Sequence, residues 1–205
     1  MVQSPPVPRA VHAARSREAM IEAALALFAQ RGFDSTTAEQ IAERAGVSPR
    51  TFFRYFPTKE SVVFHRDFGF MRSFAAAYLA QPLDLGDYEA LRATFVSLCV
   101  DFGTLRQRIL TYRKVVDSSA LLVGREHEHL EAHAATIAEA VLRRSPTTTA
   151  DDARTLADVS LALYQRALRR WLAEPTDGEP RDELAPLVDR EFARLRVSVC
   201  TRGVA

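Results

Sequence analysis

The sequence predicts an all-α fold of about nine helices. Apolar residues recur at intervals of three and four almost throughout the chain, which is the spacing that lines one face of a helix. Alternating strand patterns bounded by turn residues are absent, apart from a weak alternation over 197–199. Eight glycines are too few for a barrel or a propeller. Helices therefore have to build the whole fold.

Composition sets the broad class. With 205 residues, 47% hydrophobic and 26% charged, the chain can bury a sizeable core and is neither fibrous nor disordered in bulk. The 27 basic and 26 acidic residues give a net charge of +1, which excludes a strongly charged polyanion-coating protein but permits a local DNA-binding patch.

The two cysteines and the length of the apolar stretches indicate the cellular compartment in which the protein is expected. Cys99 and Cys200 lack CxxC spacing, which argues against a disulfide scaffold and a structural zinc site and fits a reducing cytosol. No stretch approaches eighteen apolar residues, and the most signal-like one, 19–29, contains Glu22. We expect a cytoplasmic protein that is neither exported nor inserted in a membrane.

The chain is expected to begin with a loose tail and one helix. Prolines at positions 5, 6 and 8 lack the amide donor that helices use, so 1–11 is predicted to be a disordered tail. The apolar spacing of Met20, Leu27 and their neighbours predicts a helix over about 12–31. Gly32 would end it, because glycine adopts the left-handed conformation cheaply.

A short helix is predicted next, over about 37–44. Thr37 and Gln40 have the spacing of a capping box, in which each side chain satisfies a backbone amide of the other. Gly46 breaks the helix.

A second short helix follows this break. Ser48 is a good N-cap and Pro49 suits the first helical position, so the segment over 51–56 should be helical until Pro57 closes it.

Six longer helices are expected to complete the fold. Thr58 would cap the first of them and Pro82 would end it, with the domain boundary inside that helix. We assign 12–62 to a DNA-binding domain and 63–205 to an effector-binding and dimerisation domain. The expected helices cover 58–80, 88–104, 106–118, 121–144, 151–174 and 182–197.

The stretch over 37–56 has the features of a helix-turn-helix. Small Ala42 permits a close helix crossing, Gly46 makes the turn, and apolar residues fill the wedge between the helices. With Phe52 and Phe56 facing inward at i and i+4, the opposite side of the second helix faces solvent. A purely structural helix pair with an incidental arginine face is the alternative.

The exposed side of the second helix carries side chains suited to reading DNA. Arginine can donate two hydrogen bonds to guanine, threonine can contact a thymine methyl, and tyrosine or lysine can hold a phosphate. Lys59 stands at the start of the next helix, where backbone amides also favour a phosphate. The DNA-binding residues predicted on these grounds are Pro49, Arg50, Thr51, Arg54, Tyr55 and Lys59.

From about residue 15 to 64 the chain resembles the DNA-binding domain of TetR-type transcriptional regulators. The resemblance is carried by FDSTT over 33–37, IA over 41–42, AGVS over 45–48 and FFRYFPTKE over 52–60. It implies an all-helical homodimer with three DNA-binding helices and a C-terminal ligand pocket. It also implies that Thr37, Tyr55 and Lys59 contact phosphates while Arg50, Thr51 and Arg54 read bases. Phe53 is expected to share one of these two roles.

Two positions depart from the family pattern. Phe53 stands where members often have tyrosine, so a hydroxyl contact is lacking there, and Arg50 stands where many carry a small residue or lysine. The segment over 48–56 and the residues over 62–64 are also similar to an actinobacterial subgroup that includes mycofactocin-system regulators, which implies acyl-CoA effectors.

An aromatic cluster in the C-terminal part predicts a ligand pocket. Its residues exceed what a few short helices need for packing, which favours a cavity with an apolar lining, although ordinary core packing is the simpler explanation for each one. Gln107 and nearby Arg106, Arg108 and Arg113 could meet an anionic head group. The predicted pocket residues are Phe68, Met71, Phe74, Tyr78, Phe95, Leu98, Phe102, Ile109 and Tyr112.

Histidines 127, 129 and 133 invite a metal hypothesis, since 129 and 133 share a helix face. A solvated charged face explains them better because a fourth ligand or cysteine is lacking nearby. We therefore expect no metal and no cofactor.

The helices over 151–174 and 182–197 have apolar residues on more than one face, so each needs a partner outside its own subunit. We expect a symmetric four-helix dimer interface, with burial inside a monomeric bundle as the alternative. The predicted interface residues are Leu156, Val159, Leu163, Ala167, Trp171, Leu184, Val188 and Phe192.

These patterns together predict a ligand-responsive, sequence-specific transcriptional regulator. We expect a homodimeric repressor that binds a palindromic operator in double-stranded DNA and is released by an apolar or acyl-type small molecule. Motifs typical of enzymes are lacking, such as GxSxG, HExxH or a glycine-rich phosphate loop. The alternatives are a DNA-binding regulator without an effector, and a helical carrier or enzyme.

Overall fold

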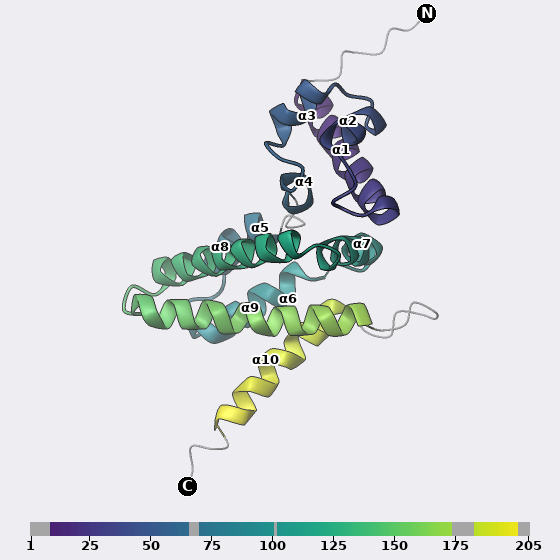
Figure 1. Cartoon of the computed structure of the whole chain (residues 1–205). Helices are drawn as coiled ribbons and strands as arrows, with labels where there is room; N and C mark the ends of the chain where they lie inside the picture. Colours follow the sequence, from purple (N-terminus) through teal and green to yellow (C-terminus); the bar gives the residue numbers. More distant parts are fainter. Residues whose placement is uncertain (1–8, 66–69, 101, 174–182, 201–205) are drawn as a thin grey trace, which may run out of the picture. The chain divides into compact units, whose positions relative to one another are not determined.

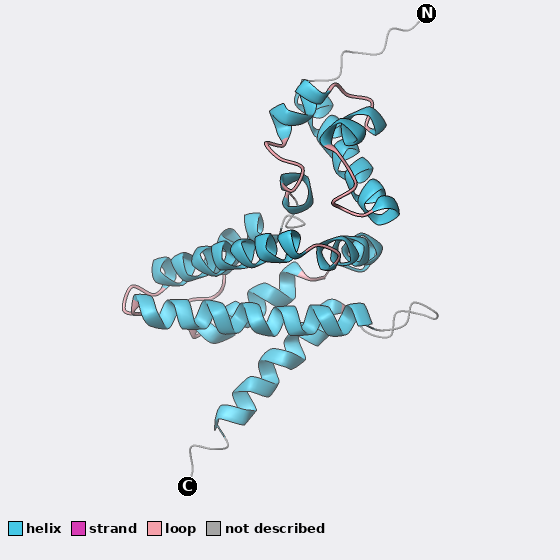
Figure 2. Cartoon of the chain, in the orientation of Figure 1, coloured by secondary structure: helices cyan, strands magenta, loops and turns pink. Residues whose placement is uncertain are grey.

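The computed structural model describes residues 9–65, 70–100, 102–173 and 183–200. Its regular structure in these residues consists of ten α-helices and one short 3-10 helix (Figure 2). The predicted all-α fold is confirmed. In the described ranges, none of the helices has the length and apolarity that a membrane crossing requires.

The helices are shown in chain order in Figure 1. Their bounds are α1 Arg9–Arg31, α2 Ala38–Arg44, α3 Pro49–Tyr55, α4 Ser61–Phe64, α5 Phe70–Leu79, α6 Asp87–Leu98, η1 Phe102–Leu105, α7 Arg106–Asp117, α8 Ala120–Arg144, α9 Ala150–Ala173 and α10 Leu184–Cys200.

Three predicted helices differ from the structure. The first, α1, begins at Arg9, so residues 9–11 of the predicted disordered tail are helical. The expected helix over 58–80 is described as two helices, α4 and α5, because α4 ends at Phe64 and His65 lies in a turn. The expected helix over 88–104 ends at Leu98, and a separate 3-10 helix covers Phe102–Leu105. Apolar spacing continued across both interruptions, so periodicity alone did not locate them.

The chain divides into two compact units. The first comprises residues 1–66 and 109–127, and the second comprises residues 67–108 and 128–205. Helices α7 and α8 each begin in one unit and end in the other. The boundary predicted at 62/63 divides the chain into two continuous segments. The first compact unit instead combines residues 1–66 with residues 109–127.

The core of the first unit is formed by the apolar faces of α1, α2 and α3. Met20, Phe28 and Ile41 are buried there together with the α3 residue Phe52 and the residue that follows the helix, Phe56. The same cluster contains three side chains contributed by α7 and α8: Val115, Val116 and Leu122. The core of the DNA-binding domain predicted over 12–62 therefore also contains residues of α7 and α8.

The second unit packs α10 against α9 and α6, and α5 against α6. In Figure 1, α10 (yellow) crosses α9 (light green). Aromatic rings occupy the space between these helices: Phe95 of α6 lies 5.2 Å from Phe74, 5.5 Å from Tyr164 and 5.7 Å from Phe192, measured between ring centroids. This burial of large rings supplies much of the apolar packing that holds α10 in place.

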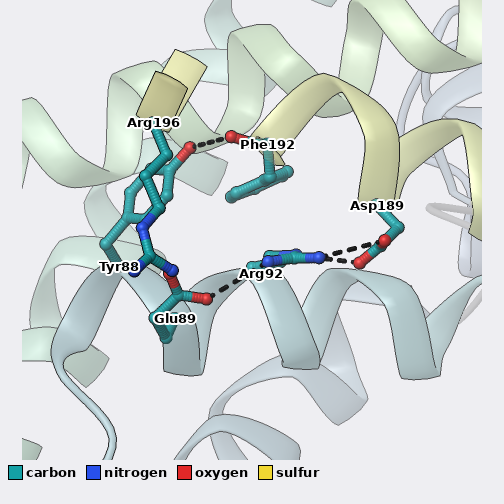
Figure 3. A network of polar contacts seen from close by, with 6 residues as sticks. All are labelled: Tyr88, Glu89, Arg92, Asp189, Phe192 and Arg196. Carbon is teal, nitrogen blue, oxygen red and sulfur yellow. Dashed lines mark hydrogen bonds and ion pairs between the residues drawn. The ribbon is translucent and has the colours of Figure 1, made fainter. Parts of the chain in front are cut away.

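Polar contacts fix the register of α10 on α6 (Figure 3). The Tyr88 hydroxyl donates a 2.7 Å hydrogen bond to the backbone carbonyl of Phe192. Arg92 donates from Nε and Nη2 to the two carboxylate oxygens of Asp189 at 2.8 and 3.0 Å. Because the Arg92–Asp189 pair is bidentate, it restrains the orientation of the two side chains as well as the distance between them.

Candidate nucleic-acid interface

Local hydrogen bonds build the helix-turn-helix as its sequence predicts. Both halves of the Thr37–Gln40 capping box form: the Gln40 amide donates to Thr37 Oγ1 at 3.2 Å, and the Thr37 amide donates to Gln40 Oε1 at 3.1 Å. Gly46 in the turn has φ +69°, a conformation that costs glycine little. Ser48 caps α3 by accepting from the Thr51 amide at 3.1 Å.

The buried side of α3 is aromatic. Phe52 and Phe56 are fully buried, with ring centroids 5.5 Å apart, and they pack in the same cluster as Ile41 and Ala42 of α2. Because these two rings anchor the helix at i and i+4, they determine which side of α3 is turned to solvent.

The structure brings the predicted DNA-reading residues together on and beside the solvent side of α3. The side chains of Arg50, Phe53 and Arg54 are exposed, and those of Thr51 and Tyr55 are half-buried. Pro49 at the start of α3 is exposed. Outside this helix, Thr37 is exposed and Lys59 is half-buried. Their contact with DNA stays a prediction.

The arginines of this surface differ in their pairing from several arginines of the second unit. In the part of the chain that the structure describes, neither Arg50 nor Arg54 takes part in an ion pair. In the second unit, Arg92 pairs with Asp189 and Arg154 with Asp158. Arg50 and Arg54 lie on the second helix of the helix-turn-helix, and arginines without a carboxylate partner suit a polyanion outside the chain.

Lys59 already has partners within its own unit. Its ammonium donates to the Phe33 carbonyl oxygen at 2.8 Å and lies 4.0 Å from the centroid of the Phe33 ring. An ammonium has three donors, so two are left for a phosphate. The contact with Phe33 was not anticipated, because 26 residues separate the two.

Sequence reasoning also missed a residue of α1. The guanidinium carbon of Arg17 lies 5.4 Å from the centroid of the Tyr55 ring, and that of Arg54 lies 5.0 Å from it. Helical periodicity identifies the buried face of α1 but does not show which other helix lies next to it. No pattern in the sequence would therefore have placed Arg17 near Tyr55 of α3.

The predicted pocket residues fall in both units. Met71, Phe74, Tyr78, Phe95 and Phe102 of the second unit are buried and Leu98 is half-buried, while Ile109 and Tyr112 belong to the first unit. Phe68 lies outside the described residues. Rings of the second unit pack on one another, with Phe74 and Tyr78 stacked at 6.1 Å. A pocket at these residues stays a prediction.

The polar groups predicted to meet a ligand are engaged in the chain. Arg106 donates to the backbone carbonyls of Trp171 and Leu172 at 3.2 and 3.4 Å and lies over the Trp171 ring. Arg113 pairs with Glu126 and with Asp117. These contacts explain the arginine cluster as part of the helix packing.

Five of the predicted dimer residues are buried in the single chain, and their contact with a second copy stays a prediction. Ala167, Trp171, Leu184, Val188 and Phe192 are buried within a single chain, because α10 packs its apolar face on α6 and α9 of its own subunit. Leu156, Val159 and Leu163 are half-buried. They share one side of α9 at spacings of three and four and remain candidates for contact with a second copy.

The histidines of α8 point largely to solvent. His127 and His129 are exposed and His133 is half-buried. Over the described ranges, His, Cys, Asp and Glu side chains do not gather in threes in a way that could hold a metal ion.

Comparison with known sequences gives matches that include the helix-turn-helix. Residues 20–65 match the family described as bacterial regulatory proteins, tetR family. The chain is 40% identical over 81 residues to the HTH-type transcriptional regulator TcmR of Streptomyces glaucescens, covering 40% of this chain and 36% of that protein. It is 36% identical over 115 residues to the regulator RutR of Escherichia coli K12, covering 55% and 48%. The chain thus spans less than half the length of both curated relatives.

A solved structure is similar over nearly the full length. The TetR-family repressor FadR of Thermus thermophilus, in complex with lauroyl-CoA, is 28% identical, with a TM-score of 0.55 over 92% of this chain and 96% of that one. The all-helical arrangement of the described residues is thus similar to that of a ligand-binding DNA regulator.

Proposed function

We propose that residues 20–65, which match the bacterial regulatory proteins of the tetR family, form a DNA-binding domain whose helix α3 reads a specific operator in double-stranded DNA. The observation that carries the proposal is the position of Arg50 and Arg54, which lie on the exposed side of α3 without an ion pair in the described ranges. Arg50, Thr51 and Arg54 read base edges in the major groove, while Thr37, Tyr55 and Lys59 hold phosphates.

The regulator acts as a homodimer. The half-buried face of α9, formed by Leu156, Val159 and Leu163, would be covered by the same face of a second copy. Charge along α9 favours an antiparallel approach of the two helices. Asp151 and Asp152 are exposed at its start, and Arg169 is exposed toward its end. Two recognition helices about 34 Å apart then read a palindromic operator.

The effector is an apolar molecule, most simply an acyl chain with a polar end. Support comes from the aromatic cluster around Phe74, Tyr78 and Phe95 in the second unit and from FadR, which is 28% identical and was solved in complex with lauroyl-CoA. The resemblance to mycofactocin-system regulators directs attention to acyl-CoA thioesters.

Effector binding would be transmitted through α7 and α8. Each of these helices contributes residues to both units, and Val115, Val116 and Leu122 are buried in the core that supports α3. An effector that binds one arrangement of these helices better shifts the population toward it. We propose that the favoured arrangement no longer matches the operator, so that the effector relieves repression in the cytoplasm.

Selection of duplexes from a random library with the full chain tests DNA recognition. The selected duplex should bind at least about a hundredfold more tightly than a scrambled duplex of equal length. Equal binding of the two duplexes would refute the proposed function.

A separate assay tests the effector. Lauroyl-CoA should raise the melting temperature and release the selected duplex, whereas coenzyme A alone should do neither. A regulator without a small-molecule effector would bind the selected duplex and fail to respond to acyl-CoA thioesters of any chain length.

A further inference from the structure

We propose that Arg17 of α1 binds a DNA phosphate and is held in position by the ring of Tyr55. This inference rests on the proposed DNA recognition by α3 and adds to it a residue outside the helix-turn-helix.

The position of Arg17 and Arg54 near the ring of Tyr55 is the observation that carries the inference. The ring of Tyr55 has one guanidinium carbon 5.4 Å from its centroid, from α1, and another 5.0 Å away, from α3. Arg54 is exposed, and Tyr55 is half-buried against the core of the first unit. The two helices therefore present two positive charges around one anchored aromatic ring.

In the described residues, the guanidinium N–H donors of Arg17 make no hydrogen bond. A guanidinium contacts an aromatic ring through its flat face, while its five N–H donors lie in the plane and point outward. In the described part of the chain, neither Arg17 nor Arg54 has a carboxylate partner. Two like charges gathered at one ring without a neutralising group favour an anion outside the chain, and a bidentate phosphate fits the available edge.

The neighbouring residues of α1 explain why Arg17 keeps its place. Met20, Ile21 and Ala24, at three, four and seven residues beyond it, are buried in the core of the first unit. Arg17 thus stands at the border of an anchored helix face, with Tyr55 limiting the positions of its guanidinium. A restrained arginine loses less conformational entropy when it binds a phosphate.

The test measures the salt dependence of binding by the full chain, with the library-selected duplex and a random duplex as probes. Arg17→Ala should weaken binding to both duplexes by a similar factor, and the slope of log K against log salt should become shallower by about 0.9 if Arg17 neutralises one phosphate. Arg17→Lys should retain the slope, because it retains the charge. Arg15→Ala is the matched control, since Arg15 lies on the same helix and makes no arginine–aromatic stack in the described residues.

A second comparison tests the role of the ring. In a Tyr55→Leu background, Arg17→Ala should lose less affinity than it does in the wild type, because the platform is already absent. An unchanged salt slope for Arg17→Ala overturns the inference even if the melting temperature falls. Failure of the wild type to prefer the selected duplex would instead overturn the proposed function, so the two failures can be told apart.

Discussion

Arg144 and Asp87 form an ion pair, with 3.0 Å between Nη1 and Oδ1, that joins the end of α8 to the start of α6. The Asp87 carboxylate also accepts hydrogen bonds from the hydroxyls of Ser145 and Tyr78 at 2.7 and 2.8 Å. Arg144 in turn donates to the backbone carbonyl of Leu85 at 2.9 Å. One carboxylate thus ties together the α5–α6 and α8–α9 connections of the second unit.

The first prediction concerns stability and pH at Asp87. Burial opposes its ionisation, but hydrogen bonds from Ser145, Tyr78 and Arg144 outweigh this and hold the pKa of Asp87 below its ordinary value. The carboxylate therefore contributes stability that is fully present above the ordinary, unfolded-state pKa and is lost as pH falls through the lower, folded-state pKa. Asp87→Asn should destabilise the protein by about 3 kcal/mol at neutral pH, with a smaller effect in acid.

Melting temperatures measured across the acid range check this prediction. Asp84→Asn is the control, because Asp84 is exposed on the same connection. An Asp87→Asn effect that stays constant down to strongly acidic pH would contradict the assigned role of the carboxylate.

The adjacent phenylalanines of α3 make a matched pair. Phe52 is fully buried, whereas 47% of the Phe53 surface is exposed. Phe52→Ala should cost about 3 to 5 kcal/mol through the cavity it leaves, and Phe53→Ala about 0.5 kcal/mol or less. Denaturant unfolding measures both free energies. Similar losses at the two positions would mean that α3 is not oriented as the structure has it.

Arg54 and Lys59 should affect DNA binding differently. Arg54→Ala should weaken binding to the selected operator by about 1 to 3 kcal/mol and leave random DNA less affected, because the variant cannot donate to a base edge. Lys59→Ala should weaken binding to both duplexes. It should also cost about 1 kcal/mol of stability, because the hydrogen bond to the Phe33 carbonyl disappears.

Titrations by fluorescence anisotropy on both duplexes, together with unfolding curves, separate these effects. Equal losses on the two duplexes for Arg54→Ala would remove it from the base-reading residues.

The α9 face is predicted to hold the dimer together. Leu163→Asp would place a carboxylate in the contact between two copies and should shift the protein to monomers at micromolar concentration. Ala162→Asp is its control, because Ala162 is exposed on the same helix. Sedimentation equilibrium measures the result. If Leu163→Asp is as dimeric as the wild type, the interface lies elsewhere.

Local interactions made the helix-turn-helix predictable. The Thr37–Gln40 box, the positive φ of Gly46 and the Ser48 cap involve residues within four positions of one another, and their chemistry is specific. The inward direction of Phe52 and Phe56 follows from helical spacing alone.

Contacts between distant segments could not be predicted in the same way. An apolar periodicity identifies the face that is buried but not what covers it, so it could not show that α10, which carries Val188 and Phe192, packs on α6 and α9 of the same chain. Arg17 beside Tyr55 and Asp87 beside Arg144 depend equally on tertiary packing.

The shared core of the first unit limits how the protein can be dissected. A fragment that stops at residue 66 would keep every element of the helix-turn-helix and still leave uncovered the apolar surface that Val115, Val116 and Leu122 bury. Such a minimal DNA reader should fold poorly and aggregate. Supplying the 109–127 segment in trans, or grafting it after α4, would be needed to obtain an autonomous DNA-binding module.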